Sequence, residues 1–237
     1  MESTPPSSKR MKSSGVKRSG RLEGWFVGKD EKIEKYIHET SRKAINNPKL
    51  ITSNWLNEQK LSKVGSMLKE QQLKKFLEMS GNIYPDLVRV FYTNLPIVGD
   101  TINSRVKGVD LETTLEVLTT VPGLKFDGLR INKGNIGVVE EFNKMQFYRC
   151  CLKNLQTKVR NFSVGGLRLN ERHIAFTVSW MLAPRGNNHP MLTKEDFVLI
   201  YCIMNKIKIN WINIIKEHMQ KSMRLSDYHY PYVVTYF

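Results

Sequence analysis

The sequence predicts a mainly α fold: a compact multi-helix domain with a small β-hairpin insertion and a disordered basic N-terminal tail. Apolar residues recur at helical spacing in several segments, three such segments follow one another across short loops near the C-terminus, and one segment alternates at strand spacing. Apolar residues make up 41% and charged residues 25% of the 237 residues, a composition typical of a globular chain. We therefore expect a single helical domain over residues 23–237.

Residues 1–22 differ in composition from the rest of the chain. They are rich in Ser, Pro and basic residues and hold too few apolar side chains to offset the entropy of folding, so we predict disorder. The tail residues that we consider candidates for nucleic-acid binding or nuclear import are Lys9, Arg10, Lys12, Lys17 and Arg18. The net charge of +15 favours polyanionic partners, and simple solubility is the alternative explanation for it.

Three helices are predicted in the N-terminal half of the domain. The first covers residues 30–46 and ends before Pro48, because the residue preceding a proline is pushed out of the helical region. The second covers residues 66–79, where apolar side chains recur at helical spacing. The third covers residues 85–94, with Pro85 at the first helical position, where its missing N–H is harmless.

A β-hairpin and a short helix are predicted next. Apolar and polar residues alternate over 102–106, and a turn follows at residues 107–108. Asp110 is the expected N-cap of a short helix. Residues 121–137 are rich in glycine, so we expect irregular structure there. The core face of the short helix is predicted to comprise Leu111, Leu115 and Leu118.

Three helices joined by short loops are predicted in the C-terminal third, and this pattern implies a helical bundle. Asn170 is the expected N-cap of the first helix, which runs to Leu182. Thr193 and Asp196 have the spacing of a capping box at the start of the second. The third begins near Asn210.

The sequence contains no recognisable catalytic, cofactor or metal site, so we predict a noncatalytic protein without a cofactor. The aspartates fall at positions that suit helix caps and turns, and the histidines lack the spacing of zinc ligands. Cys150, Cys151 and Cys202 form neither a disulfide framework nor a C-x-x-C pair, which fits a reducing compartment.

Neither a membrane span nor a signal peptide is predicted. The longest strongly apolar run is FVLIYCIM at residues 197–204, far shorter than the roughly 20 residues that a spanning helix needs. The residues after the first methionine are polar and charged. We expect a soluble intracellular protein, and the basic tail fits a nuclear location.

A second candidate surface for nucleic acid lies around the last long helix. Lysine and arginine side chains contact phosphates, and aromatic rings stack on bases. Trp211 and His218 lie among the basic residues of this surface. The alternative, which we prefer, is a solvated helix face with Trp211 packed in the core. The basic residues of this surface are Lys206, Lys208, Lys216, Lys221 and Arg224.

The C-terminal third also carries a family resemblance. The run LNERHIAFTVSWMLAPRGNNHPMLTKEDFVLIYCIMNKIKINWINIIKEHM at residues 169–219, followed by DYHYPY at 227–232, resembles the plant transposon protein domain family. The segments YPDLVRVFYTNL at 84–95 and INSRVKGVDLE at 102–112 match the opening pattern of that family, a helix ending in an F-Y-x-N-like motif and then a strand carrying V-[KR]-G. The resemblance covers residues 70–237.

This resemblance implies an origin in a mobile element. The family is widespread in plant genomes, and many legume copies are labelled envelope-like proteins of retroelements. It supplies no established catalytic residues. An envelope role would require a signal sequence and a membrane span, and neither is predicted here. Because sequences of the family tend to continue beyond the DYHYPY segment, the resemblance also implies a copy truncated at its C-terminus.

Three functions follow as alternatives. The leading one is a noncatalytic, mobile-element-derived domain that binds nucleic acid or another mobile-element protein. The second is a degenerate or accessory transposase subunit. The third is a structural assembly protein. The first predicts salt-sensitive binding of DNA or RNA, the second predicts strand nicking that depends on a divalent metal, and the third predicts oligomers that form with rising concentration.

Overall fold

The computed structural model describes residues 23–26, 30–95, 102–131, 142–186 and 188–236. Within these ranges the chain is mainly helical and contains a small antiparallel hairpin, as the sequence predicts. The basic tail, including its five candidate residues for nucleic-acid binding, lies outside the described residues.

The first part of the domain contains η1 (Glu23–Trp25), α2 (Asp30–Lys35), the π-helical turn η2 (Tyr36–Thr40) and β1 (Ala44–Ile45). The prediction of one helix over 30–46 is therefore too long. Strand β1 pairs in parallel with β4 (Asp227–Tyr228), and the Asn46 N–H donates to the carbonyl of Tyr228 at 2.8 Å. This long-range pairing outweighs the local helical pattern.

Three short helices occupy the region of the second predicted helix: α3 (Ser53–Glu58), α4 (Ser62–Glu70) and α5 (Lys74–Leu77). The prediction of one helix over 66–79 is wrong in its bounds. Gln72 has a φ of +57°, a left-handed conformation that ends one helix before the next begins. Three apolar side chains of this segment, Leu73, Phe76 and Leu77, are nevertheless buried.

Helix α6 (Pro85–Asn94) and the hairpin of β2 (Ile102–Val106) and β3 (Val109–Thr113) confirm the prediction. Lys107 and Gly108 have φ values of +50° and +82°, which suit the two-residue turn of a twisted hairpin. The Ser104 hydroxyl donates to the carbonyl of Phe91 at 2.8 Å, and this bond attaches the hairpin to α6.

Asp110 does not cap a helix, so that prediction is wrong. It lies in β3 and pairs with Arg105 across the hairpin at 2.6 Å. The N-cap of α7 (Leu115–Thr120) is instead Thr114, whose hydroxyl accepts from the Val117 N–H. The register of the hairpin therefore assigns Asp110 to a strand.

The described C-terminal part contains five α-helices, of which α10 (Lys194–Met204) and α11 (Trp211–Ser222) are the longest. Asn170 lies inside α9, not at its N-cap, so that prediction is also wrong. The capping box of Thr193 and Asp196 is confirmed, and Asn210 caps the last long helix by accepting from the Asn213 N–H at 3.1 Å. The elements are α8 (Lys144–Cys151), η3 (Val164–Gly166), α9 (Leu169–Thr177), the π-helical turn η4 (Val178–Leu182), α10 (Lys194–Met204), α11 (Trp211–Ser222) and α12 (Pro231–Tyr236).

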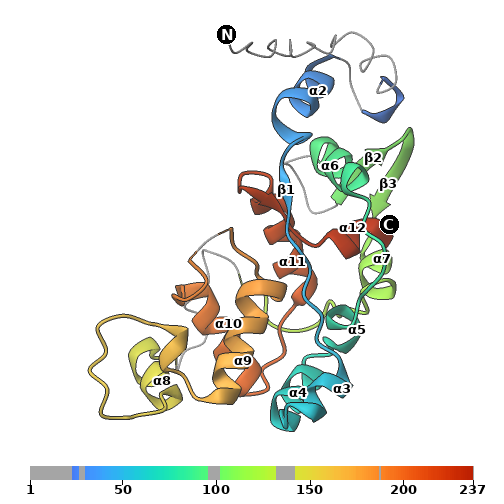
Figure 1. The fold of residues 1–237 in the computed structure, drawn as a ribbon. Coiled ribbons are helices and arrows are strands. Elements are labelled where there is room, and N and C mark those ends of the chain that lie inside the picture. The colour runs from blue at the N-terminus through green and yellow to red at the C-terminus, as the bar shows by residue number, and fades with distance from the viewer. Residues whose placement is uncertain (1–22, 27–29, 96–101, 132–141, 187, 237) are drawn as a thin grey trace, which may run out of the picture.

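The elements are distributed along an elongated molecule. Figure 1 shows α6 and the hairpin toward one end, α8, α9 and α10 toward the other, and α11 between them. Helix α9 packs against α4, so the short N-terminal helices contact the C-terminal bundle directly. Within the described ranges no helix is both long and apolar enough to cross a bilayer.

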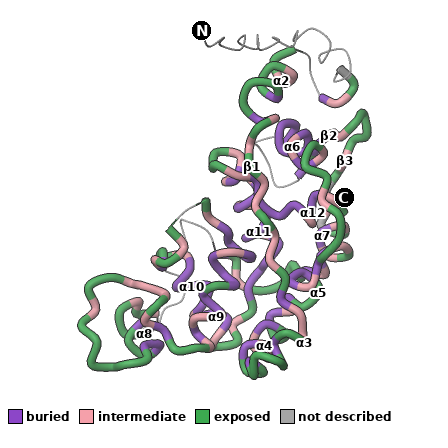
Figure 2. Tube along the Cα trace, viewed as in Figure 1, coloured by how far each residue is buried: buried purple, intermediate pink, exposed green. Residues whose placement is uncertain are grey.

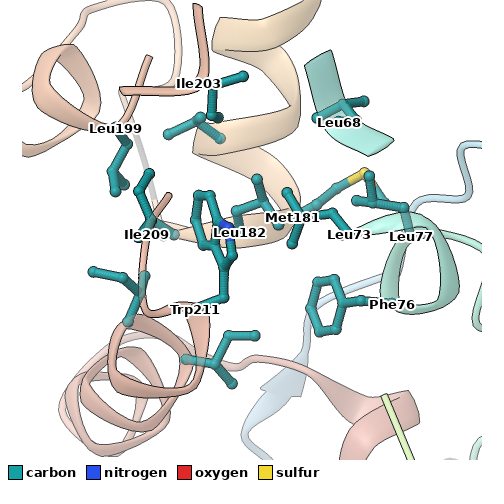
Figure 3. Close-up of a cluster of buried hydrophobic side chains, with 14 of the residues drawn as sticks. Leu68, Leu73, Phe76, Leu77, Met181, Leu182, Leu199, Ile203, Ile209 and Trp211 are labelled. Carbon is teal, nitrogen blue, oxygen red and sulfur yellow. The ribbon is translucent and has the colours of Figure 1, made fainter. Parts of the chain in front are cut away.

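One large hydrophobic core extends from Ile51 to Val234, and buried segments run through the middle of most helices (Figure 2). Trp211 lies inside it with 1% of its surface exposed, which is the arrangement that we preferred from the sequence. Figure 3 shows the Trp211 ring beside Leu182, with Phe76 facing it from α5. A smaller cluster of Phe26, Tyr36 and Val90 joins α6 to the N-terminal segment.

Gln71 connects the end of α4 to the segment that joins α10 to α11. Its amide nitrogen donates to the carbonyl of Ile207 at 2.8 Å, and its amide oxygen accepts from the Ile209 N–H at 3.3 Å and the Trp211 indole at 3.2 Å. The side chain is buried, so each of these three groups depends on it for a partner. This one residue therefore satisfies two backbone groups and one ring of a distant segment.

Replacing Gln71 with Leu should lower the free energy of unfolding by about 3 kcal/mol, because buried polar groups lose their hydrogen bonds. Urea denaturation followed by circular dichroism measures this change. Gln59→Leu is the matched control, since Gln59 is exposed and should change stability by less than about 0.5 kcal/mol. Equal stability of the two variants would contradict the structural role of Gln71.

Candidate nucleic-acid interface

The basic residues predicted around α11 do not form one free cationic face. Lys206 lies 3.9 Å from Glu70, and Lys208 lies 3.7 Å from Asp127. Both pairs precede the helix, which is about 18 Å long at 1.5 Å per residue. Carboxylates therefore partly neutralise the cations at this end.

The other end of α11 contains a denser network of charges. The Lys221 ammonium lies 3.1 Å from Glu195 and 3.8 Å from Glu217. Lys216 is half-buried and Arg224 is exposed. The His218 Nε2–H donates to the Glu195 carboxylate at 3.0 Å, and only 4% of the surface of His218 is exposed. Neither His218 nor Trp211 can stack on a base, because both rings are buried.

This network ties α11 to α10. Burial opposes ionisation of Glu195, but the hydrogen bonds and charges of His218 and Lys221 outweigh it and lower its pKa to about 2. The His218 ring also lies 3.3 Å from the carbonyl of Pro184. The cluster therefore stabilises the packing of α10, α11 and the loop at Pro184. Both nitrogen atoms of the His218 ring face groups of the protein itself, Glu195 and the Pro184 carbonyl.

His229 is fully buried close to this network. Its Nε2 lies 3.6 Å from Asp227, and neither ring nitrogen has a hydrogen-bond partner. Burial lowers the pKa of His229 to about 4, and the charges of His218 and Lys43 lower it as well. The charge of Asp227 acts in the opposite direction but does not outweigh them. The ring is neutral at neutral pH and packs as a core side chain.

Two of the cysteines are buried, and four of the described aspartates have local structural roles. Burial raises the pKa of the Cys151 thiol to about 12 and that of Cys202 to about 11, so both stay protonated and unreactive. Over the described parts of the chain, no group of three or more His, Cys, Asp or Glu side chains could hold a metal ion. Ion pairs or a helix cap engage Asp86, Asp110, Asp127 and Asp196.

A different site emerges between α3 and α9. A cavity of about 340 Å³ opens there, with the Trp55 ring from α3 on one wall and the rings of His173 and Phe176 from α9 on another. Trp55 and His173 meet edge to face at 5.8 Å between ring centroids. We call this cavity the aromatic groove; it is lined by Lys49, Leu50, Trp55, Arg172, His173 and Phe176 above the buried side chains of Ile51, Leu56 and Val64.

One ring that lines the aromatic groove, that of Phe176, belongs to a stack of three rings. The Phe176 and Trp180 rings lie 5.9 Å apart at 28°, and His189 covers Trp180 at 3.6 Å and 12°. Phe176 is the outer ring of this stack, is 39% exposed and also lines the cavity. A planar ring that enters the cavity would therefore extend a stack that the protein already contains.

Two cations flank the rings. The Lys49 ammonium lies 5.6 Å from the centroid of the Trp180 ring. The Arg172 guanidinium donates to the carbonyls of Gly165 and Leu167 at 3.4 and 3.1 Å, which fixes its position and leaves its charge in place. Neither cation forms an ion pair with a described carboxylate, in contrast to Lys206, Lys208 and Lys221.

His173 beside Trp55 and His189 in the stack are both neutral rings at neutral pH. Burial lowers the pKa of His173, and the charge of Arg172 lowers it further. Burial and the charge of Arg185 likewise lower the pKa of His189, against the opposing effect of its bond to the Ser179 carbonyl. Flat neutral rings beside fixed cations are suited to stacking, with phosphates held at the edge of the stack.

No protein-family model matches the chain, and no curated protein or solved structure matches it either. The resemblance to the plant transposon protein domain family therefore remains a prediction from the residues. The function has to be argued from the geometry of the aromatic groove.

Sequence reasoning missed this groove, although its signal is present in α9 and in the turn η4 that continues it. His173, Phe176 and Trp180 are spaced at i, i+3 and i+7, so they share one helix face. The core face of the same helical segment includes Ile174 and Val178, which are fully buried. Aromatic residues that recur at helical spacing beside the buried face of a helix indicate a surface with accessible rings.

The buried His229 should make the fold sensitive to mild acid. Its folded pKa of about 4 lies below the unfolded value of about 6.5, so stability is complete above pH 6.5 and is lost as the pH falls toward 4. Between pH 7 and about pH 4.5 this loss amounts to about 2 kcal/mol. Glu195 adds to this loss of stability only below about pH 4.5, because its pKa is lowered as well.

Replacing His229 with Phe should remove most of this loss. Urea denaturation at pH 7 and at about pH 4.5 measures it. His38→Gln is the control, since His38 is exposed, and this variant should keep the full acid sensitivity. An unchanged loss of stability in His229→Phe would contradict a neutral buried ring.

Proposed function

We propose that this protein is a noncatalytic, mobile-element-derived domain that binds nucleic acid through the aromatic groove. The proposal rests on exposed rings of the aromatic groove that lie beside two cations. Neither cation forms an ion pair with a described carboxylate. Rings provide stacking surfaces for bases, and cations provide contacts for phosphates. The net charge of +15 supports a polyanionic ligand as well.

The energetics favour the groove over the basic face of α11. Stacking of one base on an aromatic side chain contributes about 1–3 kcal/mol. The rings of α11 are buried and contribute nothing to such stacking, and three of its five predicted cations are partly neutralised. The groove offers exposed rings of Trp55 and Phe176 beside Lys49 and Arg172.

The mobile-element origin rests on the residues that resemble the plant transposon protein domain family. A domain of this kind would hold a nucleic acid or position it for other proteins of the element. The proposal requires binding that weakens with rising salt, because cations on the protein displace counterions from the phosphates. Strand nicking that requires a divalent metal would favour the transposase alternative instead.

The double variant Trp55→Ala and Phe176→Ala should weaken binding of a fluorescein-labelled single-stranded oligonucleotide by about 5-fold to 100-fold, because stacking contributes about 1–3 kcal/mol per base. Fluorescence anisotropy at low salt measures the dissociation constant. Tyr84→Ala is the matched control, since Tyr84 is 52% exposed and lies outside the groove. The thermal unfolding curve of each variant verifies the fold.

The proposed function fails if the wild-type protein binds neither DNA nor RNA at low salt. It also fails if the control weakens binding as much as the double variant does. A separate pair, Lys216→Glu and Arg224→Glu, tests the face of α11. Loss of binding in that pair with no effect of the groove variants would place the interface on α11.

A further inference from the structure

A second cationic hollow lies on the other side of the α3–α5 region. It encloses about 930 Å³ and is bounded by the end of α4, by α5 and by Tyr236 near the C-terminus. Three of its lining residues are exposed lysines. We call this hollow the lysine cleft; it is defined by Lys69, Gln72, Lys74, Lys75 and Tyr236.

The positive charge of the lysine cleft is only partly balanced. Glu78 also lines it, but its carboxylate accepts from the backbone N–H and the hydroxyl of Ser53 at 3.0 and 2.9 Å. Lys75 donates to the carbonyl of Thr120 at 2.5 Å, which holds its ammonium at the wall. None of the three lysines forms an ion pair with a described carboxylate.

The cleft and the aromatic groove are neighbours. A third hollow of about 440 Å³ lies between them. It shares Ile51 and Leu56 with the aromatic groove and Lys69 and Lys74 with the lysine cleft. Stacking rings therefore lie on one side of α3 and α4, and a cluster of lysines lies on the other.

The depth of the aromatic groove distinguishes between forms of nucleic acid. Its floor consists of buried side chains, with Leu56 8% and Val64 1% exposed. Only a base that has left its own stack can insert a ring face against Phe176 above this floor. In a duplex the base faces are covered by their neighbours, and only the edges are accessible.

We infer that the ligand is a single-stranded nucleic acid whose bases enter the aromatic groove and whose backbone passes over α3 to the lysine cleft. This inference rests on the proposed function and adds the class of ligand and its path. A strand bound in this way requires both parts: rings for the bases and lysines for the phosphates that follow.

The part of the path over the lysine cleft is tested by a variant of its own. The triple variant K69A/K74A/K75A should lower the slope of log K against log salt by about 2 for a single strand of about 12 nucleotides, since each phosphate contact contributes about 0.7. The matched control is K153A/K158A/R160A, which removes three exposed cations from the loop after α8 and should leave the slope unchanged.

The choice of probe tests the form of the ligand. Oligo-dT and oligo-U of the same length should bind at least 10-fold more tightly than a blunt duplex of that length. An abasic strand should lose the effect of the Trp55 and Phe176 substitutions and keep the effect of the three lysines.

The results separate this inference from the proposed function. Equal affinity for duplex and single strand overturns the inference, as does a lysine triple variant that behaves like its loop control. In both cases weaker binding in the groove variants would still support the proposed function. Absence of any binding by the wild-type protein overturns both.

Discussion

The hydrogen bonds of Gln71 hold the short N-terminal helices against the C-terminal bundle. The segment before α11 is bound from two sides. Gln71 satisfies Ile207, Ile209 and Trp211, while Leu129 exchanges backbone bonds with Lys208 and Asn210 at 2.8 and 3.0 Å. Buried backbone groups without partners cost free energy, so this segment is stable only when both partners are present.

The backbone pairing of Leu129 with Lys208 and Asn210 depends on a glycine. Gly128 has a φ of +103°, and a Cβ atom at this position would lie 2.7 Å from the backbone of Lys208. Only glycine permits this approach. With α4 fixed in this way, α3 and α9 both pack against it, and these contacts bring together the two helices that line the aromatic groove.

The helix patterns in the sequence predicted much of this fold. The hairpin turn at 107–108, helix α6 and the capping box of Thr193 could be predicted because each depends on neighbours in the sequence. The errors have long-range causes. The helix predicted over 30–46 ends early because β1 pairs with β4, and the helix over 66–79 divides where Gln71 turns inward to reach residues 207–211.

The candidate site could be predicted only in part. A sequence shows its basic residues but not their ion-pair partners. Nothing in it indicates that Lys206 pairs with Glu70 or that Lys221 pairs with Glu195. Trp55 lies far from α9 in sequence, and no local pattern indicates that its ring meets His173. The helical spacing of His173, Phe176 and Trp180 was the one signal of the aromatic groove in the sequence.

Ultraviolet crosslinking of a halogenated single strand, with the attachment sites mapped by mass spectrometry, shows which surface of the protein contacts the bases. We predict crosslinks at the rings that line the aromatic groove, chiefly Trp55, His173 and Phe176. Crosslinks confined to α11 or to the loop after α8, with none in the groove, would contradict it.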